Sequence, residues 1–275
     1  MTAYMSFEWL KLTKRWMPRL ILAAVLSVVV ILFLGTGSRP DSNLGNLFFP
    51  RALPASLIAA AFAAPFFWPV LGGSWLGNEY GWGSIRLILS RRPHRIEHVL
   101  ASLVVLIAGI GLALVAALVV GSLAGIATSL LTGHAVFTSG VLTGTFLLTL
   151  LKTFLVTWYG ASFILILAFA AGTIFRSAPA GIGVGVGATL AQFLTIGILD
   201  GQSGFWKTLA DHLPLRYVEN LTSSVAASSF IPGTSLARVS PGAPTVGQSI
   251  IALGIMMVAL VAATCVIVRN RDVTA

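Results

Sequence analysis

Residues that could bind a partner gather in one segment of the sequence, residues 77–95. It runs Gly-Asn-Glu-Tyr-Gly-Trp-Gly-Ser-Ile-Arg-Leu-Ile-Leu-Ser-Arg-Arg-Pro-His-Arg. Glu79 precedes glycines that permit a sharp turn, and Ser84 can cap a short helix, residues 84–90, that stops before Pro93. One side of this helix would be apolar beyond the needs of a solvated loop, through Ile85, Leu87, Ile88 and Leu89. That side predicts contact with another protein.

The arginines of the same segment have two interpretations. Arg86 lies inside the short helix and would anchor a partner contact. Arg91, Arg92 and Arg95 follow the helix and either extend this contact or only set membrane topology by attracting anionic lipid.

Sites for nucleotide, metal or hydrolysis are not predicted. A P-loop needs Gly-Lys-Ser/Thr, but the four lysines follow Leu10, Thr13, Leu151 and Trp206. The pair Glu97-His98 lacks the second histidine that a helical zinc motif requires. Residues 201–204, Gly-Gln-Ser-Gly, match the GxSG of rhomboid proteases, which are also six-span proteins. Only His212 in the same loop could serve as the base, so a polar turn is favoured.

The composition indicates which class of protein carries these residues. Of 275 residues, 57% are hydrophobic and 9% charged, against about 25% charged in soluble domains. The single cysteine excludes an intramolecular disulfide. The sequence therefore predicts an all-α integral membrane protein with one domain, residues 1–275.

Uncharged runs predict six membrane spans, because a charge at the bilayer centre is costly. The run from Val99 to Leu151 is about twice the length of one crossing and must form a helical hairpin. The second span contains Pro54, Pro65 and Pro69, which suggest a kinked or broken helix. The expected spans are residues 20–34, 55–76, 98–127, 143–173, 177–199 and 248–268.

The distribution of cations predicts the orientation. With six spans, one side of the membrane would hold eleven cations: Lys11, Lys14, Arg15, Arg19, Arg86, Arg91, Arg92, Arg95, Arg176, Arg269 and Arg271. The other side would hold five: Arg39, Arg51, Lys207, Arg216 and Arg238. The positive-inside rule then places both termini in the cytoplasm. Because this asymmetry explains the net charge of +9, nucleic acid is not an expected partner.

The N-terminal residues predict an amphipathic helix at the membrane interface. One face would carry Met5, Trp9, Leu12 and Trp16, and the opposing face Glu8, Lys11, Lys14 and Arg15. A plain membrane anchor with a basic flank is the alternative.

Other span residues offer a surface for helix packing or for cargo. Two small-xxx-small pairs in the fifth span would allow close helix approach: Gly181 with Gly185, and Gly183 with Gly187. They predict either general packing or a dimer seam and flexing cavity wall. A cavity near the prolines of the second span would be lined by Phe66, Phe67 and Trp68. Lys152, inside the fourth span, would snorkel outward or contact substrate.

The segment from Glu79 to Arg95 resembles the signature of ABC-2-type transporter permeases. That signature runs Glu, a few residues, Gly-Thr, Arg, a Leu-rich turn, Ser-Arg-Pro and a further Arg. Here Ser84 replaces the usual Thr, and Arg92 is an extra residue before Pro93. The N-terminal Glu8-Trp-Leu-Lys-Leu12, the long loop before the last span and the closing Arg269-Asn-Arg-Asp-Val273 are also similar to that family.

The resemblance implies that this chain forms the transport path and that separate subunits hydrolyse ATP. The N-terminal helix would be the connecting helix, and the helix around Arg86 the coupling helix, seated in a groove of an ATPase. The outer loop would hold short re-entrant helices with interfacial residues Phe205, Trp206, Leu213, Pro214, Leu215 and Tyr217, which could also be ordinary aromatic-belt residues. The implied assembly is a dimer of identical or related permeases in the cytoplasmic membrane with two ATPases. ATP and Mg²⁺ would bind only to the ATPases, and this chain would be no enzyme.

The expected cargo follows from the spans. Apart from Lys152, the spans have no charged residue, so a cavity between them would offer no counter-ion to a charged cargo. Such a cavity suits a hydrophobic or amphipathic molecule such as a drug, peptide or lipid, and the family implies export. An intramembrane hydrolase or an ion-coupled carrier is the alternative, although a carrier normally has several intramembrane acids, which the expected spans lack.

Overall fold

The computed structural model describes residues 2–37, 49–85, 94–131, 143–199, 203–229 and 244–270. Every regular element within these ranges is a helix. The elements are α1 (Thr2–Lys14), α2 (Trp16–Gly37), α3 (Ala52–Gly81), α5 (Arg95–Leu131), α6 (Gly144–Ile174), α7 (Ala178–Leu199), α8 (Phe205–Asp211), α9 (Pro214–Ser229) and α10 (Val246–Asn270).

Six of these helices are long and apolar enough to cross a membrane: α2, α3, α5, α6, α7 and α10. This confirms the all-helical class and the six predicted spans. Four helices are longer than the expected spans: α2 has 22 residues, α3 has 30, α5 has 37 and α10 has 25. The predicted spans ended where polar residues begin, but a helix continues wherever its polar side chains find partners inside the protein.

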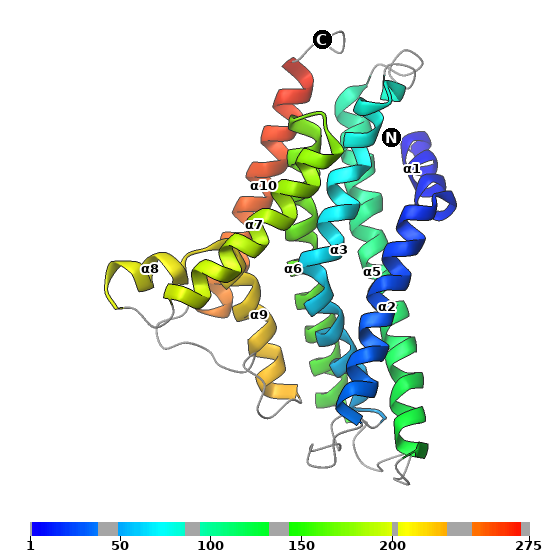
Figure 1. Ribbon diagram of the computed structural model, residues 1–275, viewed down its shortest axis with the longest axis vertical. Coiled ribbons are helices and arrows are strands. Elements are labelled where there is room, and N and C mark those ends of the chain that lie inside the picture. The colour runs from blue at the N-terminus through cyan, green and yellow to red at the C-terminus, as the bar shows by residue number, and fades with distance from the viewer. Residues whose placement is uncertain are drawn as a thin grey trace.

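The bundle is built around α3, which packs against α2, α5, α6 and α7 (Figure 1). α10 lies on the far side of α6, where it also contacts α9 (Figure 1). α1 and the end of α10 lie at the same end of the bundle (Figure 1), as an even number of crossings requires.

Of the predicted kink or break in the second span, the break is wrong, because Pro65 and Pro69 both lie within one continuous helix, α3. Proline at 69 cannot donate to the carbonyl of Pro65. The Thr189 hydroxyl of α7 lies 3.4 Å from that carbonyl oxygen, but it lies 2.9 Å from the carbonyl oxygens of Gly185 and Val186 in its own helix. Because a hydroxyl has one proton, the neighbouring helix offers the Pro65 carbonyl only a long and shared donor.

Close helix contacts explain one of the two glycine pairs. A Cβ added to Gly181 would lie 2.6 Å from Cα of Gly172 in α6 and 2.7 Å from Cα of Gly73 in α3. A Cβ at Gly185 would also clash, whereas Gly183 and Gly187 have nothing within 4 Å. Of the two alternatives, the structure therefore favours general helix packing over a dimer seam for Gly181 and Gly185, because helices of the same chain cover both.

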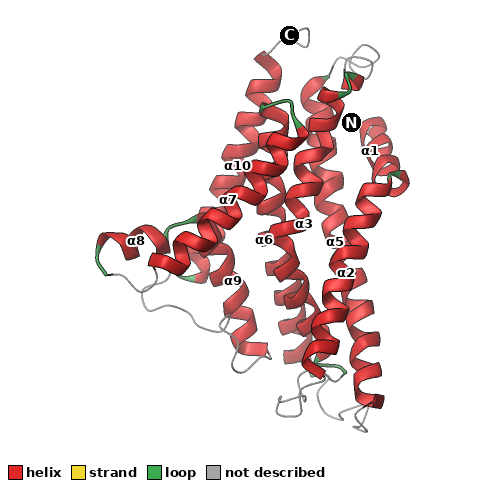
Figure 2. Cartoon of the chain, viewed as in Figure 1, coloured by secondary structure: helices red, strands yellow, loops and turns green. Residues whose placement is uncertain are grey.

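Two short helices precede the last span, as the sequence suggested for the outer loop. Figure 2 shows α8 and α9 on the part of the bundle away from α1. Leu215, Tyr217 and Leu221 of α9 are buried, while Phe205 and Trp206 of α8 are exposed. α9 therefore belongs to the packed bundle, through α6 and α10, and α8 offers its aromatic side chains to the surroundings.

Candidate functional site: a buried ion-pair cluster

Helix α1 turns part of its predicted charged face into the bundle. Glu8 and Lys11 are buried, with 0% and 6% of their surface exposed. Trp9 and Leu10 are exposed instead. The expectation that Glu8 and Lys11 lie on an outward polar face is wrong, because both side chains have charged partners inside the bundle.

Lys11 links two acids that come from different helices. Its Nζ lies 2.9 and 2.8 Å from the two carboxylate oxygens of Glu8 and donates to both. It also donates to Oε1 of Glu79 in α3. Arg15, at the bend between α1 and α2, has its Nη2 3.9 Å from the same Glu79 oxygen. One ammonium and one guanidinium thus balance two buried carboxylates.

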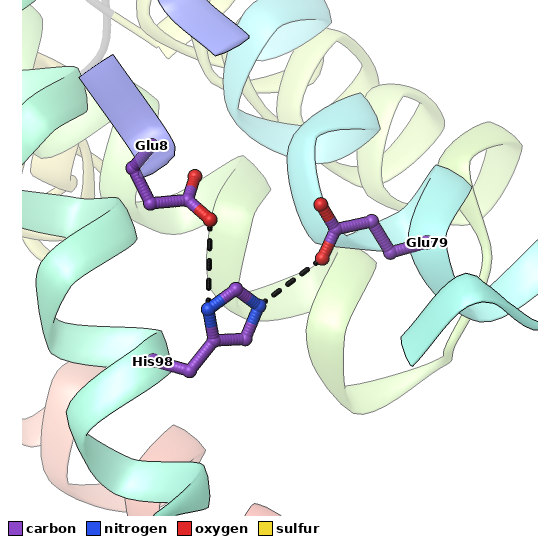
Figure 3. A group of neighbouring side chains, drawn as sticks. All are labelled: Glu8, Glu79 and His98. Carbon is purple, nitrogen blue, oxygen red and sulfur yellow. Dashed lines mark hydrogen bonds and ion pairs between the residues drawn. The ribbon is translucent and has the colours of Figure 1, made fainter. Parts of the chain in front are cut away.

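His98 of α5 lies between the same two acids (Figure 3). Its Nε2 is 3.1 Å from Oε2 of Glu79, within hydrogen-bond range. Its Nδ1 is 3.5 Å from Oε1 of Glu8 and has no hydrogen bond among the described residues. The ring of Tyr4 covers the imidazole, with 5.5 Å between ring centroids. The site therefore draws on α1, α3 and α5.

Trp75, one turn before Glu79, completes the cluster. Its Nε1 donates to Oε2 of Glu8 at 2.6 Å, and the Lys11 ammonium lies 4.7 Å from the centroid of its ring. This position allows a cation–π interaction, which is stronger where water is excluded. Removing one partner from a buried ion pair typically costs about 3–5 kcal/mol. The cluster therefore holds α1 firmly against the bundle.

Glu8, Glu79 and His98 are also a possible ligand set for a metal ion, since one ligand atom from each lies within 4.8 Å of the others. The donor chemistry argues against it. Lys11 already contacts three of the four carboxylate oxygens, and a divalent cation there would lie beside a buried ammonium. We therefore interpret the cluster as an ion-pair network.

The predicted coupling segment is only partly described. Arg86, Leu87, Leu89, Arg91 and Arg92 lie outside the described residues. Of the remaining members, Glu79 is buried in the cluster, the Ser84 hydroxyl donates to the Glu79 carbonyl at 3.3 Å, and Arg95 begins α5.

Ile85 is covered by its own chain, with 4% of its surface exposed. The expectation that it would need a partner protein for burial is therefore wrong, because it is already buried within this chain.

The aromatic residues predicted to line a cavity do not share one surface. Phe66 is 50% exposed and Trp68 is 2% exposed, while Phe67 packs partly buried against the core. Consecutive helical residues point about 100° apart, which explains the divergence. Lys152 is exposed on α6, which agrees with an outward side chain.

His98, Trp75 and Tyr4 were missed by sequence reasoning. Glu97-His98 was tested only against a zinc motif, and the search for acids stopped at the predicted span ends. The sequence does indicate an ion pair weakly, since Glu8 and Lys11 are three residues apart and can pair on one helix face. The neighbouring residues in the sequence do not indicate that this face is turned inward.

Comparisons with protein-family models, with curated proteins and with solved structures find no match for this chain. The similarity to ABC-2 permeases therefore depends on the motif residues alone.

Proposed function

We propose that this chain is the membrane subunit of an ATP-driven transporter of the ABC-2 type, and that the buried cluster transmits motion from a bound ATPase to the spans. The observation that supports this is the placement of the cluster. It joins α1, the end of α3 and the start of α5, and residues 82–94 connect these two spans. A partner that moves this connection would move all three helices together.

The proposed contact with the ATPase uses the residues of the segment that follow Ile85. Ile85 is buried and is not part of it. Leu87 and Leu89 would fill a groove of the ATPase, Arg86 would anchor the contact, and Arg91, Arg92 and Arg95 would surround it. Glu79 would not touch the ATPase. It would hold the start of the segment, at the end of α3, against α1 through its ion pair with Lys11.

The remaining parts of the proposal follow from the same assembly. Two ATPases would bind ATP and Mg²⁺, and two permeases would pair, with Gly183 and Gly187 of α7 available for a seam because nothing lies within 4 Å of either Cβ position. Both termini would be cytoplasmic, as the cation count favours. The cargo would be hydrophobic or amphipathic and exported, and α8 with α9 would form the re-entrant outer segment.

The test is co-purification with a P-loop ATPase encoded in an adjacent reading frame. The double variant Leu87→Asp/Leu89→Asp should abolish co-purification, because the interface would bury two unpaired charges. Leu130→Asp/Leu131→Asp is the matched control, since both leucines are exposed at the opposite end of α5, and it should retain the ATPase. Equal recovery of the ATPase with both double variants would contradict the proposal.

One observation favours a second candidate, an ion-coupled carrier. Buried Glu and His pairs such as Glu79 and His98 form proton relays in carriers, and both lie within helices that can span a membrane. We prefer the first candidate because Lys11 and Arg15 already balance the two acids. In vesicles, cargo flux driven by ATP and the ATPase without a proton gradient would support the first candidate, and flux driven by a proton gradient alone would support the second.

A further inference from the structure

A pocket of about 310 Å³ lies beside the cluster, between the bend that joins α1 to α2 and the last three turns of α3. Arg15, Trp16 and Met17 line it from the bend, and Leu71, Trp75 and Asn78 line it from α3. Its volume falls at the lower end of the range for small-molecule sites, and mostly apolar walls with a few polar groups are typical of such sites.

Arg15 supplies the charge of this pocket. Its side chain is 34% exposed, so it is reachable from outside the bundle. Its nearest acid oxygen, on Glu79, is 3.9 Å away, which is too long for a hydrogen bond. The guanidinium can therefore donate to a further anion, and its planar set of donors matches a phosphate group.

The outer wall of the pocket continues onto a surface suited to hydrocarbon. Trp16 is 75% exposed and Leu20, one turn further along α2, is 64% exposed. Both lie at the start of the first candidate span, which begins at Trp16. Tryptophan and arginine at such a position mark the depth at which lipid headgroups lie. A soluble anion would use Arg15 and leave the apolar walls uncovered, whereas a lipid uses both.

We propose that this pocket binds one anionic phospholipid, with its phosphate at Arg15 and its acyl chains leaving past Trp16 along α2. Charge complementarity selects an anionic over a zwitterionic headgroup. A lipid bound there contacts the bend after α1, the start of α2 and the end of α3, and fixes the bend next to the Glu8–Lys11–Glu79 cluster. This inference depends on the chain lying in a membrane and is independent of whether an ATPase docks.

The test titrates the purified chain with phosphatidylglycerol or phosphatidylcholine and counts bound lipids by native mass spectrometry. The wild-type chain should bind phosphatidylglycerol more tightly than phosphatidylcholine. Arg15→Ala should weaken phosphatidylglycerol binding about fivefold, the effect of one basic residue near an anionic surface. Lys14→Ala is the matched control, because Lys14 is exposed and does not line the pocket, and it should weaken binding less than Arg15→Ala does.

A second measurement separates lipid binding from a folding defect. Phosphatidylglycerol should raise the thermal unfolding midpoint of the wild-type chain, since a ligand of the folded state stabilises it. Arg15→Gln keeps a hydrogen-bonding side chain without the charge and should lose this rise. Equal binding of the two lipids to the wild type, or phosphatidylglycerol affinity that is unchanged in both Arg15 variants, would overturn the proposal.

Discussion

Two sides of one helix, α3, are held in place by opposite kinds of contact. Toward α1, Glu79 and Trp75 bind the charged side chains of Lys11 and Glu8, and toward α5 Glu79 binds the imidazole of His98. Toward α6 and α7, Gly73 brings backbone against backbone, because a Cβ there would lie 2.4 Å from the carbonyl carbon of Gly181. The first side depends on charge pairing and the second on the absence of side chains. We therefore expect the two sides to respond to different substitutions.

Removing the central charge should have the largest effect. Lys11→Met leaves Glu8 and Glu79 buried beside each other without their ammonium, which should destabilise the fold by about 3–5 kcal/mol. Thermal unfolding in detergent, with protease cleavage of α1, measures the loss. Lys14→Met removes the same charge from an exposed position and should cost less than about 1 kcal/mol. Similar midpoints for the two variants would show that the cluster does not hold α1.

Loss of the indole donor should have the next largest effect. Trp75→Phe removes the 2.6 Å hydrogen bond to Glu8 and keeps an aromatic ring under Lys11. The expected cost is about 1.5–3 kcal/mol, the usual range for hydrogen bonds to charged groups, measured by the same unfolding assay. Trp82→Phe is the control, because Trp82 is 70% exposed, and a cost equal to that of Trp75→Phe would refute the specific role of Trp75.

On the glycine side, a single methyl group should be enough to disturb packing. Gly181→Ala places a Cβ against Gly172 and Gly73, and overpacking of this kind costs about 1–3 kcal/mol. Gly183→Ala is the control, because it makes the same substitution in the same helix but its Cβ has nothing within 4 Å. It should be neutral or stabilising, since alanine favours helix over glycine. If Gly181→Ala were the more stable of the two, the close contact of α7 with α3 and α6 would be contradicted.

The smallest effect is expected at the Thr189 hydroxyl, which lies beside Pro65. Thr189→Val keeps the shape of the side chain and removes a hydroxyl that is 3.4 Å from the Pro65 carbonyl oxygen and 2.9 Å from two carbonyl oxygens of its own helix, for a loss of about 0.5–1.5 kcal/mol. Thr195→Val is the control, because Thr195 is exposed and bonds only to a carbonyl of its own helix among the described contacts. Equal unfolding midpoints for the two variants would argue that Pro65 needs no outside donor.

Much of the architecture could be predicted from local patterns. Uncharged runs predicted six spans, and the structure has six helices long and apolar enough to cross a membrane. The ends of the spans were less predictable, because Glu79 appears too polar for a span until its partners are known. The orientation of α1 was not predictable for the same reason. Its charged face can point to solvent or pack inside, and only partners from other helices decide between the two.

The sequence by itself determined the class of this protein, because a chain with 9% charged residues and long uninterrupted apolar segments is typical of transmembrane helices, and the structure has six helices of that kind. Only the tertiary structure decided which side of each helix is inside. Hydrophobicity separates polar from apolar residues, but Glu8 and Lys11 can be buried once Glu79, Trp75 and His98 arrive from helices far along the chain. Charge pairing of this kind depends on distances between helices, which no local pattern contains.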